Sequence, residues 1–166
     1  MGLDPGLAAT GWGVIESGAA PRHLASGVIR TSPSSEHIAR LDWIFRQTAA
    51  VAEEWKPQKA CVERVFANMN GKTSMALGEA RGAAIAALSS RGVQITELSA
   101  LQIKKSVTGA GRANKSQIAQ MIPLLLNDTP KLRADAADAL ACALALTPLA
   151  AHSSRLPPFR SGRRRR

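Results

Sequence analysis

A long amphipathic segment between two groups of strand-like sequence is the feature that most restricts the fold. Its inward-facing side chains recur every three or four residues, at Ile38, Leu41, Phe45, Thr48, Ala52 and Trp55. This period predicts a helix over residues 35–56 that ends before Pro57. A helix that joins two strands of one sheet makes a right-handed crossover, so we expect the chain to return beside the strand where it began.

Five short segments have strand-like sequence. They are residues 2–5, 10–17, 23–31, 59–62 and 93–98. The second alternates in the manner of a half-buried strand, and the fourth is an apolar run that ends just before Glu63. Strands near the start, followed by alternating helices and strands, predict an α/β fold with a five-stranded mixed sheet flanked by helices on both faces.

Further helices are predicted after the fourth and fifth strands. They cover about residues 73–90, 101–107 and 131–146, and another begins at Asn114. Asn114 is expected to cap its helix together with Gln117, three residues further on. In the first of these helices, Gly78, Gly82 and Ala86 leave a smooth stripe. Such a stripe suits close packing against a second copy of the chain or against its own sheet.

Length and charge distribution predict one folded domain with a basic tail. A chain of 166 residues that is 45% apolar has the size of a single domain, which we place at residues 1–151. Residues 152–166 hold six arginines and no acid, and removing those arginines lowers the net charge from +10 to +4. We expect this tail to be disordered. It either solubilises the protein or attracts nucleic-acid phosphates.

Cysteine usage and hydropathy indicate a reduced, intracellular protein. Cys61 and Cys142 both lie in apolar runs, and no histidine lies near either of them at a spacing typical of a zinc site. The first residues lack the layout of a signal peptide, and no apolar run approaches the ~20 residues of a membrane helix. We therefore expect a cytoplasmic protein without a membrane partner.

Four acidic residues are placed where they can share one site. Asp4 ends the first predicted strand, and Glu63 ends the strand expected beside it. Asp135 and Asp138 lie three residues apart on one face of the last predicted helix. Carboxylates that converge from separate elements can hold two Mg²⁺ ions ~4 Å apart, an arrangement that hydrolyses phosphodiester bonds.

Each acid also has a structural alternative when it is considered alone. Asp4 precedes Pro5 and Gly6 and can simply form a turn. Glu63 can be a solvated residue at a strand end. The helical pair can serve the helix dipole, because acids are favourable in the first turns of a helix. Only the joint pattern favours a metal site.

At this point the sequence resembles the RuvC family of Holliday junction resolvases, within the RNase H-like fold. The matching motifs occur in order through nearly the whole chain before the tail. They are GLDPG at residues 2–6, TGWGVI at 10–15, VERVF at 62–66, LGEARG at 77–82, LQIKKSVTGAGRANKSQ at 101–117 and ADAADALACA at 134–143.

The resemblance implies a structure-selective endodeoxyribonuclease that resolves Holliday junctions by paired symmetric nicks, in homologous recombination and DNA repair. It implies that Asp4, Glu63, Asp135 and Asp138 bind two magnesium or manganese ions for two-metal-ion hydrolysis. The position of Asp135 can also be a histidine in the family. A homodimer, a complex with a branch-migration motor, and a place in the bacterial cytoplasm at the nucleoid are implied as well.

The resemblance also implies which residues contact DNA. Phe66 matches a family aromatic that stacks on bases at the junction, and its alternative is a ring folded back onto the core. Lys104 and Lys115 match lysines that contact phosphates near the scissile bond. They flank a basic stretch that contains Lys105 and Arg112, so together they predict an electropositive rim beside the acids. Without the resemblance, these would be read as solvated side chains.

Three other classes fit part of this pattern. Another RNase H-like two-metal nuclease, such as a ribonuclease H, would keep the acids, but the motifs between residues 77 and 117 argue against it. A non-catalytic junction-binding protein would not need four converging acids. The actin and sugar-kinase fold needs two lobes, for which 166 residues leave no room.

Members of the RuvC family usually carry several apolar residues before GxDPG. We therefore expect either a truncated start or a short first strand in this chain.

Overall fold

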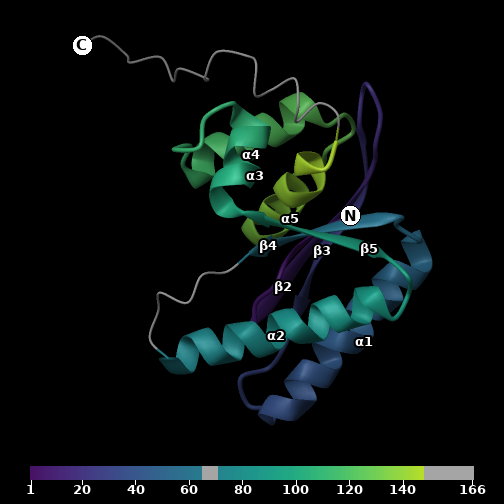
Figure 1. The fold of residues 1–166 in the computed structure, drawn as a ribbon, viewed down its shortest axis with the longest axis vertical. Coiled ribbons are helices and arrows are strands. Elements are labelled where there is room, and N and C mark those ends of the chain that lie inside the picture. Colours follow the sequence, from purple (N-terminus) through teal and green to yellow (C-terminus); the bar gives the residue numbers. More distant parts are fainter. Residues whose placement is uncertain (65–70, 148–166) are drawn as a thin grey trace.

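The computed structural model describes residues 1–64 and 71–147, which form one mixed sheet between two groups of helices (Figure 1). The strands are β1 (Gly2–Asp4), β2 (Ala9–Glu16), β3 (Arg22–Arg30), β4 (Lys59–Arg64) and β5 (Gln94–Ser99). Their order across the sheet is β3-β2-β1-β4-β5. All five predicted strands are confirmed, with small shifts at their ends.

The direction of each strand follows from its connection. Short turns make β1, β2 and β3 antiparallel neighbours, whereas β4 and β5 run parallel to β1. The helix between β3 and β4 therefore returns the chain to the free side of β1, as the amphipathic segment predicted. This arrangement brings the carboxyl ends of β1 and β4 together.

The described helices are α1 (His37–Trp55), α2 (Gly71–Ser89), α3 (Ala100–Thr108), α4 (Lys115–Leu125) and α5 (Ala134–Ala145). Asn114 and Gln117 form the predicted capping box of α4. Gly92, which follows α2, has the positive φ of 70° expected for a residue that ends a helix.

The prediction for the last helix was wrong at its start. It was expected from residue 131, but α5 begins at Ala134, and Arg133 has the extended backbone of an N-cap. Leu132 packs against the core from this extended segment, so its apolar spacing imitated a further helical turn. Ile38 was also expected to face inward, yet its side chain is 72% exposed at the start of α1.

Two apolar clusters hold the layers together, one on each face of the sheet. The first joins the sheet to α1 and α2, and includes Leu3, Ile44, Val62, Ala84 and Leu88. The second joins the opposite face to the remaining helices, and includes Cys61, Ile103, Val107, Ile122, Leu140 and Cys142. Both cysteines are buried and free, as the sequence predicted. In the described ranges, no helix is long and apolar enough to cross a membrane.

The small-residue stripe of α2 faces away from the sheet. Gly78, Gly82 and Ala86 are exposed, whereas Ala80, Ala84 and Leu88 are buried on the opposite side of the helix. A Cβ added at Gly78 or Gly82 would meet no described atom within 4 Å. Of the two interpretations of this stripe, packing against the chain's own sheet is therefore excluded.

Candidate active site

Three of the predicted acids line one cleft at the carboxyl ends of β1 and β4. Asp4, Glu63 and Asp138 border a space of about 610 Å³, together with Lys104 of α3 and Lys115 of α4. Residues from all three layers of the molecule contribute to its walls. The cleft thus combines acids from β1, β4 and α5 with basic side chains from α3 and α4.

Asp4 is held by the sheet and by a tight turn. It is the last residue of β1, and Pro5 and Gly6 turn the chain immediately after it. The buried hydroxyl of Thr10 donates to the Gly6 carbonyl at 2.9 Å and accepts from the Gly6 amide at 3.3 Å. These bonds fix the turn, and the direction of the Asp4 side chain depends on it.

Glu63 reaches the same end of the sheet from the neighbouring strand. β1 and β4 are parallel, and Leu3 pairs with Val62. Continuing that register by one residue brings Asp4 beside Glu63. The sequence prediction that these two strand ends meet is therefore confirmed by the topology.

α5 lies directly on the backbone of the sheet. A Cβ at Gly2 would overlap the carbonyl oxygen of Ala139, and a Cβ at Gly11 would overlap that of Asp135. Only glycine permits so close an approach between helix and strands. This contact sets the height at which Asp138 stands over the cleft.

Burial and neighbouring acids raise the pKa values of Asp4 and Glu63. Burial, followed by the charges of Asp138 and Glu63, raises the pKa of Asp4 from 3.8 to about 7. Burial and then Asp138 raise the pKa of Glu63, while Lys104 and Lys115 act in the opposite direction. Carboxylates crowded in this way are stabilised by any cation that enters the cleft.

Lys115 supplies such a cation in this structure. Its Nζ donates to Asp138 Oδ2 at 3.1 Å, and this hydrogen bond is the main reason that the pKa of Lys115 is raised. Because the Lys115 side chain is 83% exposed, it can leave Asp138 at little cost. The lysine therefore stands where a positive charge is favoured.

The donor set suits a hard divalent cation, although its present spacing is open. Three carboxylates supply oxygen ligands, which Mg²⁺ and Mn²⁺ prefer. Across residues 1–64 and 71–147, however, no three His, Cys, Asp or Glu side chains are close enough to hold one ion as they stand. The acids converge on one space without meeting at a common point.

Asp135 lies apart from the other three acids. It is in the first turn of α5, does not line the cleft, and its Oδ2 is 3.9 Å from Nη2 of Arg30 on β3. Its charge is the smallest of those that raise the pKa of Asp4. The structure therefore places Asp135 at the edge of the acidic cluster.

The predicted DNA contacts are only partly brought together. Lys104 and Lys115 line the cleft, whereas Lys105 and Arg112 are exposed and do not. Phe66 and the tail over residues 152–166 lie outside the described residues. For Phe66 and the tail, the sequence prediction stays a prediction.

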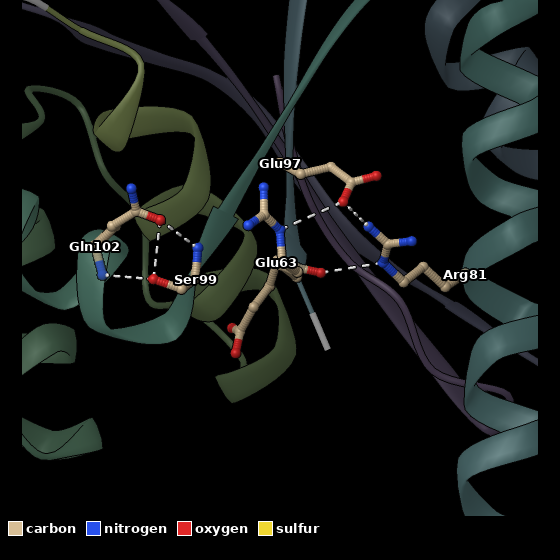
Figure 2. Close-up of polar contacts among 6 residues, drawn as sticks. Glu63, Arg81, Glu97, Ser99 and Gln102 are labelled. Atoms are coloured by element: carbon tan, nitrogen blue, oxygen red, sulfur yellow. Dashed lines mark hydrogen bonds and ion pairs between the residues drawn. The ribbon is translucent and has the colours of Figure 1, made fainter. Parts of the chain in front are cut away.

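Two arginines near the acids had no role assigned from the sequence. Arg30 lies near Asp135, and Arg81 of α2 donates from Nε to the carbonyl of Glu63 at 3.2 Å (Figure 2). Arg81 belongs to the LGEARG motif, but nothing in that motif indicates that its partner is a backbone atom on another element. Contacts of this kind are visible only once the fold is known.

Comparison with known proteins gives one consistent result. The family model described as crossover junction endodeoxyribonuclease RuvC matches residues 1–146. A protein of that name from Burkholderia ambifaria is 47% identical over 145 residues, which cover 87% of this chain and 79% of that protein. One from Methylobacillus flagellatus is 45% identical over 150 residues, covering 87% and 83%.

Solved structures agree with the family match. Thermus thermophilus RuvC in complex with a Holliday junction substrate is 29% identical, with a TM-score of 0.82 over 95% of this chain and 97% of that one. The yeast mitochondrial Holliday junction resolvase Ydc2 is 12% identical, with a TM-score of 0.63 over 93% and 79%. The second likeness concerns the fold alone.

Proposed function

The chain belongs to the RuvC family and is a crossover junction endodeoxyribonuclease with an RNase H-like fold, and we propose that the cleft between Asp4, Glu63 and Asp138 is where it cuts four-way DNA junctions. The observation that carries this proposal is the convergence of three acids, from β1, β4 and α5, on one space bordered by lysines. A purely structural cluster would not be expected to keep like charges together in a half-buried cleft.

Asp4, Glu63 and Asp138 would hold the metal, and Asp135 would complete the set from its edge. The raised pKa of Asp4, about 7, supports a site that becomes fully anionic when divalent cations bind. We infer two Mg²⁺ or Mn²⁺ ions from the family resemblance, and the charge supports this, because one divalent ion would neutralise only half of the charge of four carboxylates. Such ions, when bound, supply a more acidic water and stabilise the leaving oxygen.

The side chains around the acids orient the DNA. Lys104 and Lys115 face the cleft and would pair with phosphate oxygens on either side of the bond that is cut. Lys115 would then exchange Asp138 for phosphate, since both partners are anionic and the lysine is exposed. Lys105 and Arg112, further out, would attract the DNA backbone without reaching the reacting atoms. Phe66 would stack on bases at the crossover.

Two sites acting together would require a homodimer. The exposed face of α2 supports this, because Met75 is 64% exposed and Gly78 and Gly82 leave room for close approach. A symmetric pair of clefts would nick two opposed strands and leave ligatable ends. The motor complex and the nucleoid location in the bacterial cytoplasm rest on the family resemblance, and the curated relatives are bacterial.

A cleavage assay tests the proposal. The chain should nick four-way junctions in Mg²⁺ and leave duplex, RNA–DNA hybrid and single-stranded DNA largely intact. Asp4→Asn should abolish nicking while junction binding in chelator persists. Preferential cutting of the hybrid would favour a ribonuclease H instead, and Asp4→Asn that still nicks would remove the acids from the mechanism.

A further inference from the structure

The carbonyl group of Glu63 lies where the sheet cannot supply a donor. β1 and β4 are parallel, and the Cys61 amide donates to the Met1 carbonyl at 2.9 Å. In a parallel ladder, each residue bonds to the two residues that flank its partner, so the pattern repeats every second residue. Two residues further along both strands, the bond to the Glu63 carbonyl would come from the backbone amide of residue 5. That residue is Pro5, and proline has no N–H.

Arg81 of α2 occupies the place of that missing donor. Its Nε donates to the Glu63 carbonyl oxygen at 3.2 Å, from a side chain that is only 18% exposed. Its Nη2 lies 2.9 Å from Glu97 Oε2, an ion pair whose angles are not those of a hydrogen bond. The guanidinium group therefore joins α2, β4 and β5 at the strand end where the cleft opens.

The backbone carbonyl and the side-chain carboxylate of Glu63 point in opposite directions. Figure 2 shows the carbonyl turned toward Arg81, while the carboxylate extends away from it on the other side of the strand. Fixing the carbonyl fixes the peptide plane that follows Glu63, and the direction of the side chain depends on that plane. β4 ends one residue later, at Arg64, so Glu63 lies at the end of the ladders with β1 and β5 that the structure describes.

We propose that Arg81 is a positioning residue that replaces the sheet donor absent at Pro5 and so aims the Glu63 carboxylate into the cleft. Glu97 holds Arg81 in place, and it faces Arg64 Nε at 3.7 Å as well. The proposal rests on the assignment of Glu63 to the metal site. The alternative role for Arg81 is a simple tie between α2 and β5 through Glu97.

The first test compares metal response in the full chain. For Arg81→Ala, the Mg²⁺ concentration that gives half of the maximal nicking rate should rise about 10- to 100-fold, the range typical when a residue that orients a ligand is lost. The same shift should appear in the Mg²⁺-induced rise of the thermal unfolding midpoint, which needs no turnover. Junction binding in chelator should not change. Arg46→Ala, which removes an exposed arginine paired with Asp42 on α1, is the control for charge.

A second test restores the missing donor. Pro5→Ala returns an amide at position 5, so adding it to Arg81→Ala should recover part of the lost Mg²⁺ response. Arg81→Lys keeps one donor and should shift the response less, and it serves if Arg81→Ala does not fold. Unchanged Mg²⁺ curves in both Arg81 variants, or no recovery in the double variant, would overturn the proposal.

A Glu63 variant distinguishes the positioning role of Arg81 from the assignment of Glu63 to the metal site. Glu63→Gln should itself lose the Mg²⁺-induced rise in midpoint. If Glu63→Gln retains that rise, the metal assignment of the cleft fails. If Glu63→Gln loses the rise while Arg81→Ala keeps it at normal Mg²⁺ concentrations, only the positioning role fails.

Discussion

Replacing Asp4 with asparagine should stabilise the metal-free protein at alkaline pH. The pKa of Asp4 is raised from 3.8 to about 7, mainly by burial. The folded state therefore binds a proton more tightly than the unfolded state does. It follows that the contribution of Asp4 to the free energy of unfolding falls as the pH rises from about 4 to about 7 and is level beyond that.

The size of this effect follows from the same pKa values. At ~1.4 kcal/mol per pKa unit, a rise of about 3 units means that ionised Asp4 costs the fold ~4 kcal/mol above pH 7. At pH 5 about a third of that cost is present, because the unfolded state has already lost most of its proton. Relative to the native chain, Asp4→Asn should thus gain ~2 to 3 kcal/mol in unfolding free energy between pH 5 and pH 8.

Urea unfolding in chelator, followed by circular dichroism from pH 5 to pH 8, measures this difference. The exposed Asp42, which pairs with Arg46, provides a control because Asp42→Asn should change little with pH. Added Mg²⁺ should bring the pH profile of the native chain closer to that of Asp4→Asn, because a bound cation stabilises the ionised carboxylates. Parallel pH profiles for the native chain and Asp4→Asn would refute the account of a strained, proton-holding Asp4.

Three further changes test separate parts of the molecule. Gly11→Ala should destabilise the protein by ~1 to 3 kcal/mol and slow nicking, because the added Cβ overlaps the Asp135 carbonyl; Gly18→Ala, with no atom within 4 Å, is the matched control in urea unfolding. Removal of residues 155–166 should reduce the slope of log binding constant against log salt concentration by up to ~5, because up to six phosphate contacts are lost. An unchanged slope would mean that the tail only solubilises the protein. Phe66→Ala should slow cleavage of intact junctions more than that of nicked ones, whereas equal losses would indicate a core role.

Local sequence patterns were sufficient for the elements and for the pairing of Asp4 with Glu63. Strand-like runs, one long amphipathic helix and the handedness of crossovers leave few ways to arrange this chain. The juxtaposition of the two strand ends then follows from topology. The same reasoning could not place the start of α5, because Leu132 packs on the core from extended backbone.

The finer arrangement of the cleft could not be derived from spacing. Asp135 and Asp138 share a helix face, yet only Asp138 borders the cleft. Which of the two acids reaches it depends on how α5 packs on the sheet. The bonds from Lys115 to Asp138 and from Arg81 to the Glu63 carbonyl join residues 23 and 18 positions apart. Their partners are defined by packing in three dimensions, which no local period records.

α5 packs directly against the glycines of β1 and β2. As a result, the distance between Asp4 on β1 and Asp138 on α5 can be increased by substitution but not decreased. Nothing smaller than glycine exists, so any substitution at Gly2 or Gly11 lifts the helix and moves Asp138 away from Asp4. The helix therefore already lies as close to the sheet as side-chain size allows. A redesign that brings the acids closer together would have to slide α5 along its axis, because its height above the sheet cannot be lowered.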